Sequence, residues 1–313
     1  MQERMAMALT AIALALALAS TSAEGAGAID LPVARPASGP TETIAAKSDD
    51  YDRMTVPVTV REHGPFRFMV DTGAQRTVLS DMVAARLGVT GTEQAQVTGV
   101  AGTRVVSVVN VDRLKLGRRS WAGKQLPILL ANDVGADGII GLDGLQGQRV
   151  MIDFRRNEVT LIDRVSRDPA ADGFEIVVEA KRHNGELIMT NAVIDGVKVD
   201  VVIDTGSDVS VGNRALQKAL GSRVQGRTEL QSVTGQSIQA EYGTARQFSI
   251  DGFKVTGMPI AYTDSPSFAL MGLDRRPALL LGMPTLRLFD RIAIDFVAKR
   301  VMFDMPAASI PNS

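Results

Sequence analysis

The chain has 313 residues, of which 45% are apolar and 22% are charged, a composition typical of a globular protein. Its 34 Lys and Arg nearly balance 35 Asp and Glu, so no net charge favours binding to nucleic acid or to an anionic membrane. Cysteine is absent, which excludes disulfides and thiolate metal sites, and a His-dependent hydrolase would have to use His63 or His183.

The first predicted segment is a secretory signal peptide over residues 1–23. Arg4 precedes an apolar run over residues 5–19, and small residues follow it through Ala23. The run is shorter than a transmembrane helix requires, so an uncleaved anchor is the less favoured alternative. Residues 24–50 are rich in Ala, Gly, Pro, Ser and Thr, which predicts a linker or a pro-segment. We therefore expect an exported protein and, because disulfides are excluded, a bacterial periplasm.

From Tyr51 onward, short runs of β-forming residues alternate with Gly, Asn and Asp. The sequence predicts strands over residues 54–60, 66–70, 103–111, 126–130 and 150–154. Two segments have a helical pattern, residues 80–87, with Ser80 as the N-cap, and residues 213–220. The predicted fold class is therefore all-β with a few short helices.

Three sequence blocks occur twice in the same order, which predicts two homologous β-rich lobes. The matching blocks are residues 68–74 (FMVDTGA) with 201–207 (VVIDTGS), 138–141 (GIIG) with 279–282 (LLLG), and 149–154 (RVMIDF) with 291–296 (RIAIDF). We place the first lobe at residues 51–164 and the second at residues 165–313, with a hinge over residues 163–173.

The paired Asp-Thr-Gly motifs resemble the pepsin and retropepsin-like aspartic peptidases over most of residues 54–304. Residues 70–79 (VDTGAQRTVL) are close to the retroviral form, and residues 203–211 (IDTGSDVSV) are nearer to the pepsin form. The resemblance implies a single chain with two lobes of the acid-protease type and an active site at the lobe interface. It implies that Asp71 and Asp204 are the two catalytic carboxylates.

The loops around these two carboxylates have supporting residues. They are Thr72, Gly73 and Ala74 in the first lobe and Thr205, Gly206 and Ser207 in the second. Each glycine permits a tight loop whose backbone N–H groups approach the carboxylate. The resemblance implies that the two threonine hydroxyls brace the loops across the interface.

Two carboxylates that face each other cannot both ionise cheaply, so we expect Asp71 and Asp204 to share one proton. The ionised member would take a proton from an attacking water while the protonated member donates to the scissile carbonyl oxygen. Ser207 follows the second motif and can donate to Asp204, whereas Ala74 offers no such donor to Asp71. Because hydrogen bonding to the charged form lowers a pKa, we expect Asp204 to be the more readily ionised.

Two glycine-rich segments, residues 97–102 (VTGVAG) and 232–235 (SVTG), lie between predicted strands about 30 residues after each Asp. They resemble the flaps that close over the substrate in this family and exclude water. The candidate flap residues are Thr98, Gly99 and Gly102 in the first lobe and Val233, Thr234 and Gly235 in the second. Ordinary hairpin turns are the alternative. Neither segment contains the tyrosine familiar from pepsin flaps.

For the other acidic residues, the sequence favours structural roles over a metal site. Asp133, Asp137 and Asp143 lie close together among glycines, but their spacing does not match a calcium-binding EF-hand loop. Asp153 and Asp295 recur in the repeat, each within an alternating strand, and are predicted to be structural. We expect neither a metal nor a cofactor.

The favoured function is an aspartic endopeptidase that acts on extended peptide or protein segments, with one chain sufficient to form the active site. The first alternative is a catalytically weak or inactive peptide-binding protein of the same fold. The second is a carboxylate-pair hydrolase acting on sugars, which the aromatic content of only 4% disfavours.

Overall fold

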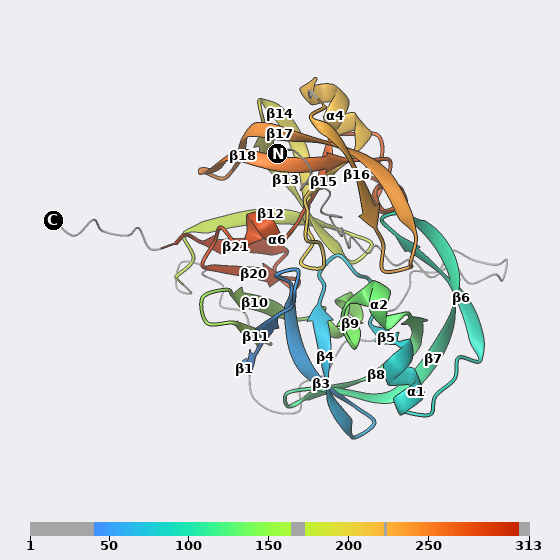
Figure 1. The fold of residues 1–313 in the computed structure, drawn as a ribbon. Helices are drawn as coiled ribbons and strands as arrows, with labels where there is room; N and C mark the ends of the chain where they lie inside the picture. Colours follow the sequence, from blue (N-terminus) through green and yellow to red (C-terminus); the bar gives the residue numbers. More distant parts are fainter. Residues whose placement is uncertain (1–40, 164–172, 222–223, 307–313) are drawn as a thin grey trace, which may run out of the picture.

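The structure is a computed structural model that describes residues 41–163, 173–221 and 224–306. Strands in two sheets dominate it, with six short helices among the described residues, which confirms the predicted all-β fold. Figure 1 shows two lobes, one coloured blue to green and the other yellow to red. The predicted signal peptide, residues 24–40 of the predicted linker and most of the predicted hinge lie outside the described residues.

Lobe one is built on a sheet of eight strands. In spatial order they are β2 (Lys47–Ser48), β3 (Met54–Val60), β4 (His63–Val70), β9 (Gly138–Ile140), β5 (Val78–Ser80), β8 (Arg119–Leu129), β7 (Gly102–Leu116) and β6 (Glu93–Gly99). The accompanying helices are α1 (Asp81–Arg86), α2 (Ala131–Val134) and α3 (Leu142–Leu145). The buried cross-strand pairs Val56–Phe68 and Val58–Phe66 show why this sequence forms a hairpin, since β-branched and aromatic side chains pack well on a pleated surface.

Lobe two repeats this arrangement. Its strands, in spatial order, are β12 (Ile176–His183), β13 (Glu186–Ile194), β14 (Val197–Ile203), β19 (Ala278–Leu281), β15 (Val211–Gly212), β18 (Phe253–Tyr262), β17 (Ser237–Ile250) and β16 (Gly226–Gln231). Its helices are α4 (Arg214–Leu220), α5 (Pro266–Leu270) and α6 (Met283–Leu286). In the part of the chain that the structure describes, no helix combines the length and the apolar character needed to span a bilayer.

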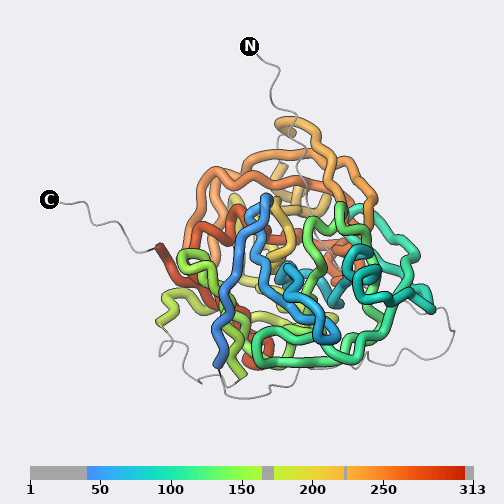
Figure 2. The backbone as a smooth tube through the Cα atoms, turned by 60° about the horizontal axis from the view of Figure 1, so that its bottom comes forward, coloured from blue at the N-terminus to red at the C-terminus, as the bar shows by residue number. Residues whose placement is uncertain are grey.

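Six antiparallel strands join the two lobes. Their order is β1 (Thr41–Ala45), β11 (Glu158–Ile162), β10 (Arg149–Asp153), β20 (Arg291–Asp295), β21 (Arg300–Asp304) and the first half of β12. At the central pair, Arg149 lies opposite Asp295, and their buried side chains form an ion pair of 3.1 Å. In Figure 2 the green and red strands lie side by side at this junction. The third repeated block of the sequence therefore builds the contact between the lobes.

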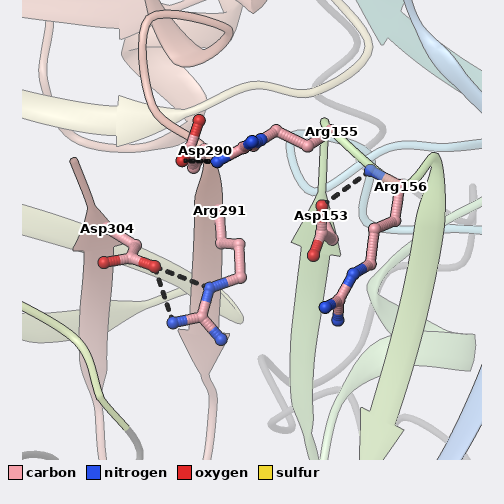
Figure 3. A pocket seen from close by; sticks show the side chains of 6 residues that line it. All are labelled: Asp153, Arg155, Arg156, Asp290, Arg291 and Asp304. Carbon is pink, nitrogen blue, oxygen red and sulfur yellow. Dashed lines mark hydrogen bonds and ion pairs between the residues drawn. The ribbon is translucent and has the colours of Figure 1, made fainter. Parts of the chain in front are cut away.

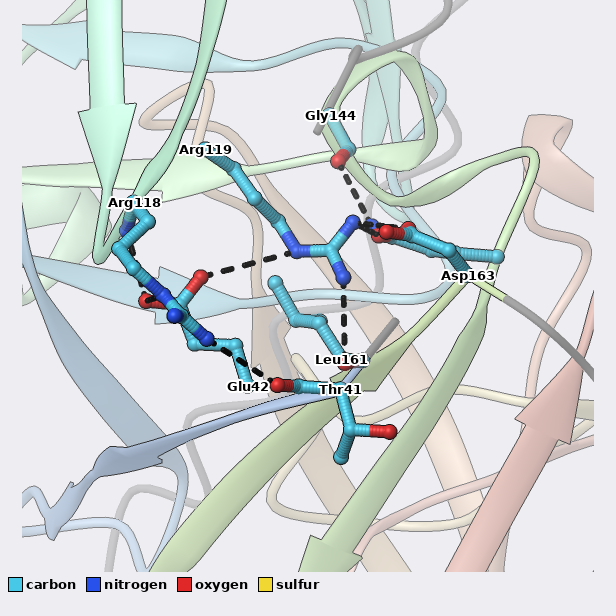
Figure 4. Close-up of polar contacts among 8 residues, drawn as sticks. Thr41, Glu42, Arg118, Arg119, Gly144, Leu161 and Asp163 are labelled. Carbon is cyan, nitrogen blue, oxygen red and sulfur yellow. Dashed lines mark hydrogen bonds and ion pairs between the residues drawn. The ribbon is translucent and has the colours of Figure 1, made fainter. Parts of the chain in front are cut away.

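Residues 41–48 form β1 and β2, within the segment that was predicted to be a linker or a pro-segment. Strand β1 is held by Arg118 and Arg119, which follow β7 (Figure 4). The Glu42 carboxylate accepts the backbone N–H of Arg118 at 2.7 Å, and its other oxygen lies 3.8 Å from Nε of Arg119. Arg119 also donates to the carbonyl of Leu161 on β11 at 3.1 Å. These contacts with distant residues are invisible in the local composition of residues 24–50.

The other predicted elements agree closely with the structure. Strand β3 has the predicted bounds, while β4 begins three residues earlier and β7 continues to Leu116. Helix α1 begins after Ser80, whose hydroxyl accepts the N–H of Val83 as the predicted cap. Helix α4 begins after Asn213, which caps it in the same way.

Candidate active site

Both Asp-Thr-Gly loops leave the end of a buried strand at the same place in their lobes. Asp71 follows β4 and donates its backbone N–H to the carbonyl of Ile140 on the parallel strand β9, at 3.1 Å. Asp204 follows β14 and donates to Leu281 on β19, also at 3.1 Å. The apolar residues before each Asp are buried, so the strand carries the carboxylate into the interior.

The second repeated block ends in a glycine in each lobe, and these glycines allow close packing behind the two Asp loops. A Cβ on Gly141 would lie 2.4 Å from the backbone of Arg76, and one on Gly282 would lie 2.3 Å from the carbonyl oxygen of Val209. Real Cβ atoms do not approach so closely, so only glycine fits at these two positions. The strands β9 and β19 therefore press directly against the two Asp loops.

The two threonines of the motifs tie the loops together across the lobe interface. The Thr72 hydroxyl donates to the carbonyl of Ile203 at 2.8 Å, and the Thr205 hydroxyl donates to the carbonyl of Val70 at 2.7 Å. The Thr205 oxygen also accepts the backbone N–H of Thr72 at 3.1 Å. The hydroxyls lie where the resemblance placed them, and each holds the backbone of the opposite lobe.

This crossing brings Asp71 and Asp204 together. A Cβ on Gly206 would lie 2.4 Å from Oδ2 of Asp71, and one on Gly73 would lie 3.0 Å from Oδ1 of Asp204. Each carboxylate accepts the N–H of its own loop glycine, at 2.8 Å from Gly73 and 3.1 Å from Gly206. Oδ2 of Asp71 has no hydrogen-bond partner among the described residues. The two carboxylates thus lie against each other's loops, and neither side chain is more than 1% exposed.

The two carboxylates differ in their electrostatic surroundings. Burial raises the pKa of Asp71 to about 7, while the Gly73 N–H and the Arg53 guanidinium act in the lowering direction. Burial raises the pKa of Asp204 well above its ordinary value, and the charge of Asp71 adds to this rise. Two further acids, Glu186 and Asp208, raise it again. Asp71 therefore has a cation among the charges that act on it, whereas the charges that act on Asp204 come from acids.

The predicted hydrogen bond from the Ser207 hydroxyl to the Asp204 carboxylate is not found among the described residues. The Ser207 hydroxyl donates to the carbonyl of Val209 at 2.7 Å and so braces its own loop. Ala74 is fully buried at the equivalent position of lobe one. The prediction considered only the nearest residue along the chain, whereas Arg53, which precedes β3, and Glu186 on β13 act on the two carboxylates from elsewhere in the sequence.

The candidate flap residues lie at the tips of two hairpins. Thr98 and Gly99 end β6, Gly102 begins β7, and Val233, Thr234 and Gly235 form the turn between β16 and β17. Val100 is fully buried in an apolar cluster of lobe two that includes Val202, two residues before Asp204. Val233 is fully buried in a cluster of lobe one that includes Met69, two residues before Asp71. Each tip is therefore seated beside the Asp loop of the opposite lobe.

The two tips also contact each other. Arg104 on β7 donates to the carbonyl of Thr234 at 2.8 Å, and Gln236 donates to the carbonyl of Thr103 at 3.4 Å. A Cβ on Gly99 would lie only 2.0 Å from the Ser232 hydroxyl. In Figure 1 the upper end of β6 approaches the lower end of β16 between the lobes. With both tips in place, the paired carboxylates are closed off from solvent.

Three charged residues near the carboxylates were missed from the sequence. They are Arg53, Glu186 and Asp208. Arg53 is fully buried and forms an ion pair with Asp49 at 2.7 Å. Burial raises the pKa of Asp208 to about 7, against the opposing effect of Arg53. The repeat held a usable signal, because Asp208 is the second residue after the second Asp-Thr-Gly, where the first copy has Gln75.

The three acidic residues that were compared with a calcium-binding loop, Asp133, Asp137 and Asp143, lie in different surroundings. Asp137 accepts the backbone N–H of Arg67, and the buried Asp143 accepts both the N–H and the hydroxyl of Thr77. The side chain of Asp133 lies beside Gly235 of the lobe-two flap. Among the described residues, no group of three or more His, Asp or Glu is placed to hold a metal ion.

A hollow of about 440 Å³ lies at the interlobe strands, away from the Asp loops (Figure 3). Three Asp and three Arg line it, namely Asp153, Arg155, Arg156, Asp290, Arg291 and Asp304. Arg155 pairs with Asp290 at 2.9 Å and Arg291 with Asp304 at 2.6 Å, while Asp153 accepts the N–H of Arg156. Because these charges largely neutralise one another, the hollow offers no excess charge to a ligand.

Comparison with known proteins agrees with this geometry. A family model described as aspartyl protease matches residues 56–143 and 190–285, one region in each lobe. Each region contains one Asp-Thr-Gly loop and the glycine that packs behind it. No curated protein matches the chain. The two matched regions span more than half of the sequence, and the chain therefore belongs to the aspartyl protease family, with two lobes of the pepsin and retropepsin-like type.

Proposed function

We propose that the chain is an aspartic endopeptidase in which Asp71 and Asp204 activate a water molecule for attack on a peptide bond. The observation that carries the proposal is the meeting of two buried carboxylates from separate lobes, each against the other's loop glycine. Such a pair holds one proton between its members at the working pH. A single chain supplies both halves of the site.

The charge asymmetry assigns the two roles. The positive charge of Arg53 favours the ionised form of Asp71, so we assign to Asp71 the removal of a proton from the water. Asp204 lies among other acids and keeps its proton, which it donates to the scissile carbonyl oxygen. The loop N–H groups of Gly73 and Gly206 hold both carboxylates in place.

The flaps control access to these carboxylates. Val100 and Val233 fill the apolar surfaces beside the Asp loops, so a peptide reaches the carboxylates only when both tips lift. An extended peptide can then pair with the freed hairpin edges, and closure over it excludes water. This mode of binding favours unfolded or extended segments of a protein substrate.

The test is cleavage of a denatured protein mixture, with the products identified by mass spectrometry. Asp71→Asn and Asp204→Asn each remove one ionisable group without changing the shape of the site, and each should reduce turnover by about 10³-fold or more. Asp274→Asn, the same change at a partly exposed side chain, should retain the wild-type rate. Wild-type turnover in either dyad variant would disprove the assignment.

The same experiment separates the peptidase from a peptide-binding protein. If the wild type retains peptides without forming products between pH 4 and 9, the chain binds but does not cleave. We further propose export to a bacterial periplasm, based on the apolar run at residues 5–19. Cell fractionation, with sequencing of the mature N-terminus, tests this second proposal.

A further inference from the structure

A third carboxylate, that of Glu186, lies beside the Asp pair and takes no part in the reaction as described. Its side chain is 1% exposed, and neither of its oxygens has a hydrogen-bond partner among the described residues. A buried carboxyl without a partner is rare because it loses its hydration and gains nothing in return. The position therefore requires an explanation in terms of function.

Strand register places Glu186 beside the Asp204 loop. Ile188 pairs with Val202, two residues before Asp204, so continuing the register by two residues sets Glu186 opposite Asp204. Alternate residues of a strand share a face. Ile188 and Val202 lie on the face that receives the flap tip Val100, whereas Leu187 and Met189 belong to the core beneath. Glu186 thus lies on the face from which the flap lifts.

Comparison with lobe one shows that the position does not require an acid for the fold. Thr55 pairs with Met69 as Ile188 pairs with Val202, so Arg53 is the equivalent of Glu186. Arg53 has internal partners, because it pairs with Asp49 and donates to the carbonyl of Val134 at 3.3 Å. The same backbone position thus holds a cation with partners in one lobe and an acid without them in the other.

Among the residues that the structure describes, no positive charge acts on Glu186. The neighbouring charge that acts on it is the carboxylate of Asp71, which repels it. Arg182, next to the β-turn that precedes Glu186, binds the side-chain oxygen of Gln146 instead. His183, its register partner on β12, is exposed and lies beside Gly272. A cation from outside the chain would therefore meet a carboxylate that has no competing partner.

We propose that Glu186 forms a specificity subsite for a cationic group of the substrate, next to the scissile bond on the lobe-two side. This inference rests on the proposed peptidase function and names its substrate class, peptides that carry an ammonium or guanidinium group near the cleaved bond. When the flap lifts and the peptide enters, the cation occupies the space beside Ile188 and pairs with the carboxylate. Charge-assisted hydrogen bonds of this kind are shorter and stronger than neutral ones.

The test compares acetylated peptides of one sequence that carry either Lys or norleucine at each of the three positions on either side of the cleaved bond. At one position the wild type should cleave the Lys peptide with a kcat/KM about tenfold or more above that of the norleucine peptide. Glu186→Gln should abolish this preference, so that it cleaves the Lys and norleucine peptides with equal kcat/KM. Glu179→Gln, the same change at an exposed acid on β12 that pairs with Arg300, should keep the preference.

A second arm identifies the source of the cation. Lys-free peptides with a free or an acetylated N-terminus show whether an α-amino group replaces the side chain, and a gain that depends on Glu186 in either arm supports the subsite. Equal cleavage of Lys and norleucine peptides by the wild type, with no gain from a free N-terminus, would overturn it. A preference that survives in Glu186→Gln would also overturn it. Failure of the wild type to cleave any peptide would instead count against the peptidase function itself.

Discussion

The two lobes have the same backbone around their Asp loops but opposite charges beside them. In lobe one the residue opposite the Asp is Arg53, whereas in lobe two it is Glu186. Two residues after the Asp-Thr-Gly motif, lobe one has Gln75 and lobe two has Asp208. A pair of identical subunits would have to surround both carboxylates identically, whereas one chain can vary each side independently.

This difference explains how a pseudo-symmetric site acquires two carboxylates with distinct surroundings. The threonine contacts and the loop glycines are shared by both lobes and fix where the carboxylates lie. In the proposed mechanism, the unshared charges decide which member holds the proton. Arg53 lowers the pKa of Asp71, and Glu186 and Asp208 raise that of Asp204. The residues that both lobes share therefore set the positions of the two carboxylates, and the charged residues that differ between the lobes set their chemical roles.

Removing Arg53 should have the largest effect on this asymmetry. Arg53→Gln leaves Asp49 without its buried cation, and we expect a loss of unfolding free energy of about 3 kcal/mol, measured by urea denaturation. The pKa of Asp71 should rise above about 7, because a lowering charge is gone. Since the reaction needs Asp71 ionised, the acidic limb of the rate profile should move to higher pH.

Arg53→Lys is the matched control for this prediction. It retains the positive charge but not the planar group that contacts both Asp49 and the carbonyl of Val134. We expect it to lose stability while keeping the acidic limb near the wild-type position. An acidic limb that does not move in Arg53→Gln would show that the two Asp residues are not distinguished by this charge.

The repeat made most of the fold and the centre of the site predictable from sequence. Asp71 and Asp204 could be paired because each stands within a block that recurs with its strand and its packing glycine. Arg53 and Glu186 could not be found in that way, since neither belongs to a repeated block. Their positions depend on strand register, which only the folded structure fixes.

The flaps show a second limit of local sequence. Their glycines mark the hairpin tips, but the apolar residues Val100 and Val233 determine where the tips lie. Each valine is buried by the opposite lobe, so nothing within its own segment signals the contact. The strand β1 was missed for the same reason, because Arg119 and Glu42 are 77 positions apart along the chain and meet only after folding.

Blocking contact between the flaps should have the next largest effect. Gly99→Ala places a Cβ 2.0 Å from the Ser232 hydroxyl, so the two tips cannot close as they do in the wild type. We expect kcat/KM for peptide cleavage to fall by about 10- to 100-fold, since an open site admits water and loses contacts with the bound peptide. The unfolding free energy in urea should change less than the activity does.

A second substitution makes this prediction reversible. In Gly99→Ala with Ser232→Ala, the offending hydroxyl is absent, and the remaining Ser232 Cβ lies 3.4 Å from the new methyl group, an ordinary contact distance. The double variant should recover most of the activity, and Ser232→Ala alone should stay close to the wild type. Equal activity of the single and double Gly99 variants would mean that the flap tips do not need to meet.

The smallest expected effect concerns the stability of the closed site, and it depends on pH. Burial raises the pKa of Glu186 well above 4.5, so the folded chain must take up a proton that the unfolded chain releases. Below pH 4.5 both states hold the proton and no penalty arises. As the pH rises above 4.5, the wild type should lose about 1.4 kcal/mol of stability per pH unit at this residue until the raised pKa is reached.

Glu186→Gln removes the titrating group, so this pH-dependent loss should disappear. The stability of the variant relative to the wild type should therefore improve by about 1 kcal/mol between pH 4.5 and 5.5 in urea denaturation, because the group is already half ionised in the unfolded chain at pH 4.5. Comparing the two pH values cancels the constant cost of burying an amide. Glu179→Gln should show no such change, because that side chain is 69% exposed. If the difference in unfolding free energy between Glu186→Gln and the wild type stays constant with pH, Glu186 remains solvated in the folded chain. The surroundings of the two carboxylates would then differ less than the sequences of the two lobes suggest.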